Sequence, residues 1–354
     1  METRSAESMI ESFGGKKWTS IEKFLANFDL PIEESTLNYE SFRVICAALF
    51  PPDEIQQNDW MIQNIFRLFD CDRDGILKGQ EWKTFCDWLR VMFEPVIALL
   101  IVDVQNDFID GSLALRDCGC NQDGVDVVEP INYLIKEGQF DKIIYSRDWH
   151  PENHISFYEN LHLRELHPDS KITKENAKPF DTVMFADPHL EQKLWPKHCV
   201  MNTKGSDFHK ALVIAPGAEQ VRKGQDPEVD SYSVFFDNNS KNTTQLLPLL
   251  KEARVTHVFI CGLAYDVCVK STALDGLRLG YPVAVINDCC RGVDTDDIED
   301  TKKLISENGG LIVNSEDVLS LVNEKKRSVI MSHQSAKMMT SISFSERSVN
   351  TSAE

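Results

Sequence analysis

Cys268 stands where a cysteine can act as a nucleophile. Residues His257–Cys261 form a short apolar, β-branched run that is typical of a buried strand, Gly262 ends it, and apolar residues then recur at helical spacing as far as Gly280. Asp266 is an acceptable N-cap, which places Cys268 in the first helical turn. Unpaired backbone N–H groups there favour a thiolate and can stabilise an oxyanion. The alternative is that Cys268 is a small buried hydrophobic residue.

A carboxylate and several imidazoles form a second set of reactive residues. Asp148 and His150 are two positions apart, His154 lies four positions further on, and His198 follows well downstream. A carboxylate with two imidazoles suits a divalent transition metal; Zn²⁺ is the expected ion, with Fe²⁺ or Mn²⁺ as alternatives. The chain has nine histidines, so a chance arrangement is the competing interpretation.

The elements that position these residues alternate between short apolar strands and amphipathic helices. The predicted strands are Val96–Val102, Lys142–Ser146, Ala211–Ala215, His257–Cys261, Pro282–Asn287 and Leu311–Val313. The predicted helices between them are Val125–Lys136, Thr243–Ala253, Asp266–Leu279 and Asp297–Glu307. This alternation predicts an α/β fold with a doubly wound, mostly parallel six-stranded sheet, whose sites form at the carboxyl ends of the strands. Asp103 directly follows the first strand and is a candidate site residue, although it can instead cap the loop.

A calcium-binding loop is predicted nearer the N-terminus. Residues 70–81 read DCDRDGILKGQE and match the twelve-residue EF-hand loop, with apolar helical stripes on both sides. The ligands that this pattern assigns are Asp70, Asp72, Asp74, the backbone carbonyl of Ile76, and Glu81. Lys78 departs from the pattern, because a cation cannot orient a ligand water and weakens affinity, so a loop that seldom holds Ca²⁺ is the alternative. Helical spacing in Ile21–Phe28 and Tyr39–Phe50 predicts a degenerate partner hand.

Length and composition limit the remaining possibilities. The 354 residues allow about two domains, and the formal net charge of −19 argues against nucleic acid as a partner. We expect no membrane span and a cytoplasmic or nuclear setting, because no apolar run is long enough and the ten cysteines show no CxxC pairs. A homo-oligomer is left open. The expected organisation is a flexible N-terminus (1–17), a small all-α EF-hand domain (18–95), the α/β domain (96–323) and a disordered Ser-rich tail (324–354).

Four blocks of sequence resemble one known family. They are ALLIVDVQNDF (98–108), SRDWHPENHISF (146–157), WPKHCV (195–200) and CGLAYDVCVKSTALDG (261–276). In order and spacing these blocks look like those of nicotinamidases in the isochorismatase-like cysteine-hydrolase superfamily, over roughly residues 95–323. The resemblance implies hydrolysis of nicotinamide to nicotinate and ammonia through a Cys thioester, in NAD salvage, on a sheet ordered 3-2-1-4-5-6.

The resemblance also assigns roles to residues. It implies a catalytic triad of Asp103, Lys223 and Cys268, although Lys223 carries no signal of its own in the sequence. It implies an oxyanion hole from the N–H groups of Ala264 and Cys268, beside a cis peptide at Leu263–Ala264. The remaining implied site residues are the aromatic walls Phe108 and Trp195 and the metal shell Asp148, His150 and His198. His154 matches a position that ligates the metal in only some relatives.

Other functions stay open at this point. Another amide hydrolase of the same superfamily is the nearest alternative, although the DxH…H metal shell favours nicotinamide. A calcium-binding adaptor with an inactive hydrolase domain is an alternative of a different class, and the intact triad argues against it. Calcium can regulate the hydrolase, or the N-terminal domain can be a passive folding module.

Overall fold

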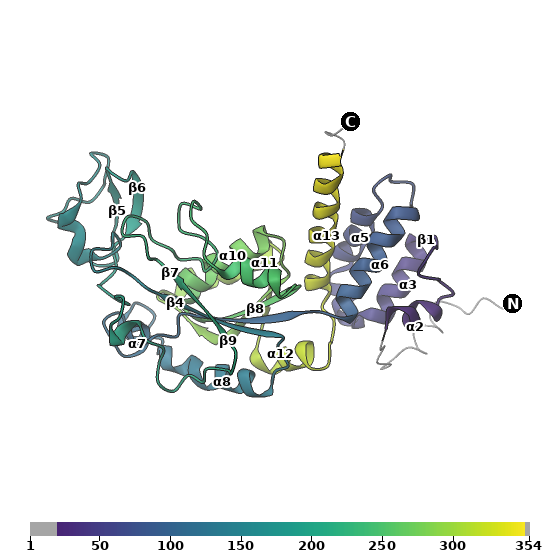
Figure 1. Cartoon of the computed structure of the whole chain (residues 1–354), viewed down its shortest axis with the longest axis horizontal. Coiled ribbons are helices and arrows are strands. Elements are labelled where there is room, and N and C mark those ends of the chain that lie inside the picture. The colour runs from purple at the N-terminus through teal and green to yellow at the C-terminus, as the bar shows by residue number, and fades with distance from the viewer. Residues whose placement is uncertain (1–19, 351–354) are drawn as a thin grey trace.

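A six-stranded, entirely parallel sheet forms the centre of the larger part of the molecule, in a computed structural model that describes residues 20–350 and the side chains of 20–341 (Figure 1). Its strands are β3 (Ile97–Val102), β4 (Lys142–Asp148), β7 (Glu219–Lys223), β8 (His257–Leu263), β9 (Val283–Arg291) and β10 (Leu311–Val313). The spatial order is β10-β9-β8-β3-β4-β7, which is 3-2-1-4-5-6 when the strands are counted along the chain. The predicted α/β sheet and its strand order are confirmed. The order reverses between β3 and β8, so the loops after these two strands diverge and leave a crevice there.

Helices cover both faces of the sheet. In Figure 1, α10 and α11 lie on one face, and α8 and α12 lie on the other. The helices of this part are α7 (Asn106–Ile109), α8 (Val128–Glu137), α9 (Leu246–Glu252), α10 (Lys270–Arg278), α11 (Thr295–Glu307) and α12 (Ser315–Val322). Every residue of β3 and β8 is buried, as expected of central parallel strands with both faces covered.

One predicted strand is wrong. Residues 211–215 are not in the sheet, and the third strand is β7, which begins at Glu219. Val213 and Ile214 are 48% and 41% exposed, and side chains of Asn132 and Tyr145 bond the backbone of this segment. β7 escaped detection because it is a polar edge strand that buries only alternate residues, one of which is a lysine.

The long segment between His150 and His198 forms a lobe of its own. It carries the antiparallel hairpin of β5 (Thr182–Phe185) and β6 (Leu190–Lys193) and packs around a separate small apolar cluster. Backbone bridges join the two ends of this segment, with His150 beside Val200 and Phe157 beside Trp195. The lobe therefore leaves and returns at neighbouring points, and the residues at both ends stay together.

The N-terminal part of the described chain is helical apart from one short pair of strands. This helical module (21–93) consists of α2 (Ile21–Ala26), α3 (Tyr39–Leu49), α4 (Pro52–Gln57), α5 (Asp59–Phe69) and α6 (Gly79–Phe93). Its core is aromatic, with edge-to-face contacts such as Phe42 on Phe66 and Phe69 on Phe85. The loop before α3 and the loop between α5 and α6 meet in a short pair of antiparallel strands, β1 (Leu37–Asn38) and β2 (Ile76–Leu77). Two helix–loop–helix units are therefore joined loop to loop.

The predicted disordered tail is wrong for residues 329–350, which form the helix α13 (Val329–Asn350). Val329 and Ala336 are fully buried in the core of the helical module, and Met331 is buried in the core around the sheet. The sequence showed no strong apolar period here because the buried positions are divided between two partners and include Ser and Ala. The predicted flexible N-terminus, 1–17, lies outside the described residues. None of the described helices has the length and apolarity needed to span a bilayer.

Gly262 provides a test of how closely β8 packs against β3 at the centre of the sheet. It has φ +119°, and a Cβ added there would overlap the carbonyl of Val102 on the neighbouring strand. We expect Gly262→Ala to destabilise the fold by more than about 3 kcal/mol, from backbone strain and the clash together. Gly217→Ala is the matched control, because Gly217 has φ +73° with open space around it, so only the strain of about 1 kcal/mol applies. Thermal unfolding measures both, and equal melting temperatures would contradict the packing described.

Candidate active site

Three side chains from distant parts of the chain meet at the carboxyl edge of the sheet. Asp103 directly follows β3, Lys223 is the last residue of β7, and Cys268 lies in a single π-helical turn (Tyr265–Val269) between β8 and α10. Lys223 Nζ forms an ion pair with Asp103 Oδ2 at 2.9 Å and donates a hydrogen bond to Cys268 Sγ at 3.3 Å. The side chains of Asp103 and Lys223 are completely buried. The structure thus brings together the three residues that the resemblance assigned to a catalytic triad.

Further hydrogen bonds fix the side chains of Asp103 and Lys223. Ser146 Oγ donates to Asp103 Oδ1 at 2.6 Å and accepts from the Asp103 N–H. Lys223 Nζ donates to the Ser231 carbonyl at 2.8 Å and pairs with Asp148. Ser146 is not among the predicted site residues. Its position nevertheless indicated a role, since Ser146 and Asp148 share one face at the carboxyl end of β4. Ser231 follows no recognisable element and carried no such signal.

The charges of this cluster are unevenly distributed. Burial raises the pKa of Asp103 to about 6, against the opposing effect of Lys223. Burial also raises the pKa of the Cys268 thiol well above its ordinary value, again opposed by Lys223. Burial disfavours the Lys223 ammonium, but Asp103 and Asp148 outweigh it and raise the lysine's pKa, so the cation persists.

The expected lowering of the Cys268 pKa is therefore wrong for the free protein. The cysteine is buried in one π-helical turn rather than exposed at the start of a long helix, and loss of hydration dominates. Oxygen and sulfur atoms of Asp103, Asp148 and Cys268 lie within 4.8 Å of one another. The carboxylates thus lie near the thiol, and the Lys223 ammonium contacts them and the sulfur.

Asp148, His150 and His198 form a buried group with the geometry of a metal shell. Ligand atoms of all three lie within 4.8 Å of one another. The Nδ1–H of His150 donates to the Gly224 carbonyl and that of His198 donates to the Pro196 carbonyl, both at 2.8 Å. These bonds leave the two Nε2 atoms facing Asp148 Oδ2, at 3.6 and 3.8 Å. Backbone bonds of this kind fix the tautomer of ligating histidines, so the donor set fits a divalent transition metal.

His154 lies against this shell. Its ring stacks on that of His150 with centroids 4.1 Å apart, and its Nδ1 is hydrogen-bonded to Ser156 Oγ at 2.8 Å. Its Nε2 is buried and has no hydrogen-bond partner among the described residues. His154 also groups with His150 and Asp230, with ligand atoms within 4.8 Å. His154 therefore offers a free nitrogen at the edge of the same shell.

An apolar pocket opens beside Cys268 and the metal shell. The expected aromatic walls, Phe108 and Trp195, both line it, as do Ala264 and Cys268. The peptide bond Leu263–Ala264 is cis, at the position that the resemblance implied. The pocket also includes Asp230 and Tyr232, which the sequence did not indicate. Tyr232 accepts a hydrogen bond from Trp195 Nε1 at 3.2 Å, which fixes the indole.

Two polar residues after β3 hold the loops of the site together. The Gln105 side chain donates to the Asp148 carbonyl and accepts from the Asp148 N–H, each at 2.8 Å. Asp107 accepts from the Cys199 N–H at 2.7 Å, next to His198. The positions of Asp148 and His198, two members of the metal shell, thus depend on the loop that follows Asp103.

Comparison with known proteins places this arrangement in a family. A family model described as "Isochorismatase domain" matches residues 97–317, more than half of the chain. The chain belongs to the isochorismatase family. The helical module precedes the matched region and α13 follows it.

The similar proteins include several nicotinamidases. The nicotinamidase of Escherichia coli is 38% identical over 203 residues, which cover 56% of this chain and 85% of that protein. A solved nicotinamidase/pyrazinamidase of Acinetobacter baumanii is 35% identical with a TM-score of 0.54, covering 64% of this chain and 99% of its own. The solved yeast nicotinamidase bound to the inhibitor nicotinaldehyde is 29% identical with a TM-score of 0.52. The match covers 62% of this chain and 99% of the yeast protein's chain.

The metal shell is testable without an activity assay. We expect His150→Ala to retain less than about one-tenth of the transition metal bound by the unaltered protein, because a ligand and its fixed tautomer are both lost. His162→Ala, a change at an exposed histidine, should leave the content unchanged. Elemental analysis after dialysis measures the metal, and circular dichroism confirms that both variants fold. Full metal content in His150→Ala would show that the ion is held elsewhere.

Proposed function

We propose that this chain is a nicotinamidase, which hydrolyses nicotinamide to nicotinate and ammonia. The observation that carries the proposal is the contact of Lys223 with both Asp103 and Cys268 beside an apolar pocket. A cysteine with a carboxylate base and a fixed cation is suited to hydrolysis of an amide through a thioester. The similarity to nicotinamidases supports nicotinamide as the amide.

The reaction follows from the positions of these groups. Asp103 takes the thiol proton of Cys268, and the thiolate attacks the carboxamide carbon to form a C–S bond. The resulting oxyanion accepts hydrogen bonds from the N–H groups of Ala264 and Cys268, each worth about 3 kcal/mol when well aimed. Collapse breaks the C–N bond, and Asp103 gives its proton to the departing ammonia. A water that Asp103 deprotonates then cleaves the thioester to nicotinate, and the thiol is restored.

Lys223 has an electrostatic role in this scheme. Its ammonium lies between the two carboxylates and the sulfur, so it stabilises negative charge on whichever group is deprotonated.

Phe108 and Trp195 supply flat apolar walls for an aromatic ring. Asp148, His150 and His198 would hold a divalent transition metal, with Zn²⁺ expected and Fe²⁺ or Mn²⁺ as alternatives. When bound, this ion supplies a Lewis-acid contact that orients a ring nitrogen.

Loss of the nucleophile tests the proposed reaction. Cys268→Ala should lower ammonia release from nicotinamide by about 10⁴-fold or more, since no other group can form the thioester. Nicotinamide binding, measured by calorimetry, should persist because the pocket walls and metal shell are unchanged. Cys120→Ala, which alters a cysteine outside the pocket, should keep full activity. Turnover by the Cys268→Ala protein would contradict the assignment, and no release by the unaltered, metal-loaded protein would exclude nicotinamide as the substrate.

We propose a second site in the helical module, an EF-hand calcium site in the loop 70–81. Ligand atoms of Asp70, Asp72 and Glu81 lie within 4.8 Å of one another. Asp70 is only 8% exposed, and neither its Oδ1 nor Glu81 Oε2, both buried oxygens, has a hydrogen-bond partner in the part of the chain that the structure describes. Buried carboxylate oxygens without donors are costly unless a cation balances them, which supports Ca²⁺ as the ligand.

The remaining expected ligands surround this group. Asp74 accepts from the Ile76 N–H at 2.9 Å, and Gly75 makes the turn between them with φ +82° and its N–H bonded to Asp70. Lys78 forms ion pairs with Asp74 and Asp72, so its ammonium competes directly with a divalent ion for two ligands. This contact gives a physical reason for weak calcium binding.

Removing that competing charge should tighten the site. We expect Lys78→Gln to lower the calcium dissociation constant about tenfold, the effect of removing a unit positive charge a few ångströms from the ion. Lys83→Gln changes an exposed lysine of α6 outside the loop and should have little effect. Titration calorimetry with Ca²⁺ measures both. Equal affinity in the two variants would exclude competition by Lys78, and no binding in any protein would exclude the calcium site.

A further inference from the structure

Helix α13 contacts both parts of the protein with two different faces. In Figure 1 it stands between the helical module and the α10–α11 layer of the sheet domain. Residues 329, 332, 333 and 336 recur at i, i+3, i+4 and i+7, and they face the module. Residues 331, 334 and 338 recur at i, i+3 and i+7, and they face the sheet domain.

The module-facing contacts involve the two helices that flank the calcium loop. Trp88 of α6 donates its Nε1–H to the Ser332 carbonyl at 2.9 Å, in a buried contact. His333 Nε2 is hydrogen-bonded to Asn64 Oδ1 of α5 at 2.7 Å, and its ring meets that of Trp60 edge-on, 5.4 Å between centroids. Ala336 is fully buried between them in the same core. α13 thus occupies the apolar face of α5 and α6 as an amphipathic helix occupies a groove.

The other face of α13 contacts the ends of two catalytic-domain helices. Gln334 Nε2 donates to the Asn308 carbonyl at the end of α11, at 3.0 Å. Met338 packs on Gly280, just after α10, so closely that a Cβ on Gly280 would lie 3.2 Å from Met338 Cγ. α10 continues directly from the turn that holds Cys268. A displacement of α13 would therefore act on α10, the helix that directly follows the turn holding Cys268.

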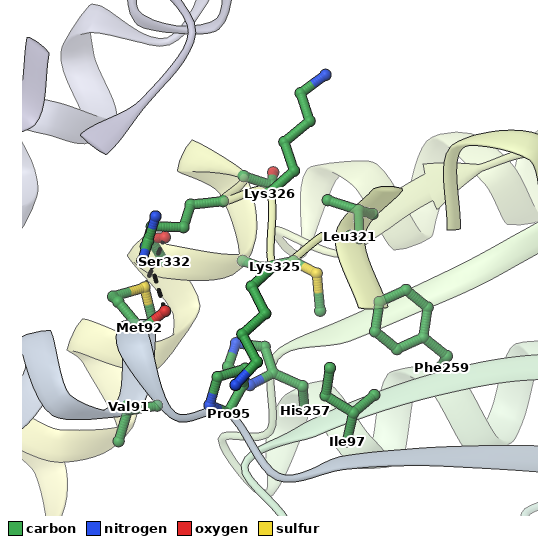
Figure 2. A pocket seen from close by; sticks show the side chains of 13 residues that line it. Val91, Met92, Pro95, Ile97, His257, Phe259, Leu321, Lys325, Lys326 and Ser332 are labelled. Carbon is green, nitrogen blue, oxygen red and sulfur yellow. Dashed lines mark hydrogen bonds between the residues drawn. The ribbon is translucent and has the colours of Figure 1, made fainter. Parts of the chain in front are cut away.

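The start of α13 is fixed at the junction of the two parts, which Figure 2 shows. Arg327 Nε donates to the Met92 carbonyl at 3.2 Å, and its guanidinium lies 4.4 Å from the Phe93 ring centre. Glu54 accepts a hydrogen bond from the Val329 N–H at 2.8 Å. A small pocket lies here, between the end of α6, the first residues of β3 and β8, and the 325–328 linker. The start of α13 is therefore held against the last turn of α6.

We propose that α13 is an intramolecular ligand of the helical module and couples the calcium loop to helix α10. This inference rests on the calcium site and the nicotinamidase activity proposed above. Calcium binding in sensors of this kind changes the angle between the two flanking helices. α5 and α6 cannot change their angle without altering the buried contacts of Trp88, Asn64 and Ala336 with α13. Since α13 also bears on Gly280 and Asn308, calcium occupancy and occupancy of the active site each affect the other.

Linkage makes this coupling measurable as binding. Couplings between sites commonly change affinity about 5- to 150-fold, and the change is reciprocal. We expect saturating nicotinate, the proposed product, to change the calcium dissociation constant of the full chain by at least about fivefold. Two calorimetric titrations with Ca²⁺, one with nicotinate and one without it, give the ratio of the two dissociation constants.

Variants of α13 separate coupling from simple attachment. Ala336→Gln places an amide in the module core and should bring the ratio to 1, while both ligands still bind. Lys337→Gln introduces the same residue at the neighbouring, exposed position and should keep the ratio. Gln334→Ala removes only the bond to Asn308 and should reduce the ratio without loosening the module. Hydrogen exchange of residues 329–341 should show faster exchange in Ala336→Gln and a calcium-dependent change in the unaltered chain.

Each failure has a distinct meaning. If nicotinate leaves the calcium dissociation constant of the unaltered chain unchanged while both ligands bind, the coupling is overturned and α13 only joins the two parts. An unchanged ratio in Ala336→Gln, with exchange showing α13 released, overturns its role as the connection. Absence of calcium binding overturns the inference through the calcium site, and absence of nicotinate binding overturns it through the proposed activity.

Discussion

A buried lysine shared by two carboxylates is the interaction on which the active site depends. An ammonium with no exposed surface is stable only if negative charge surrounds it, and Lys223 has Asp103 and Asp148 as partners. The three groups come from the ends of β7, β3 and β4, which are neighbours in the sheet. Each strand must therefore end at its observed position, because a missing partner would leave a buried charge uncompensated. The Lys223 ammonium also links Cys268 to the metal shell, because it contacts both Cys268 Sγ and Asp148, and Asp148 is a member of that shell.

The loops around this cluster are held by hydrogen bonds from groups that do not react. Gln105 binds both backbone groups of Asp148, and Asp107 fixes the backbone beside His198. The lobe between His150 and His198 begins and ends at paired backbone positions, so its length does not disturb the shell. The pocket walls Trp195 and Tyr232 are likewise joined by a hydrogen bond. Rigidity of this kind supports catalysis, because reacting groups held in position need no reorganisation during the reaction.

The two parts of the described chain share more than a linker. α13 completes the core of the helical module, and it also buries Met331 against the sheet domain. The module therefore requires the far end of the chain for part of its core. This arrangement gives the loop 70–81 a packed connection, through α13, to α10, which directly follows the turn that holds Cys268.

Much of the architecture was determined by the sequence itself. Central strands such as β3 and β8 are apolar along their whole length, and the polar residues after them mark the active edge, so Asp103, Asp148 and Cys268 could be located from local pattern. The loop 70–81 could be predicted as a calcium site because its expected ligands lie within twelve consecutive residues. Lys223 could be assigned only by resemblance, because a lysine on a polar edge strand shows no sign of burial in its local sequence.

Other features were decided only by tertiary structure. Residues 211–215 are apolar but lie outside the sheet, since bonds from Asn132 and Tyr145 hold their backbone elsewhere. The pKa of Cys268 is raised rather than lowered, because burial depends on what surrounds the turn and not on the turn itself. α13 is a helix because two distant surfaces each bury one of its faces, and neither face is apolar enough to show in the sequence. Local pattern determines which segments can form an element, whereas burial, charge pairing and docking depend on contacts between residues far apart in the chain.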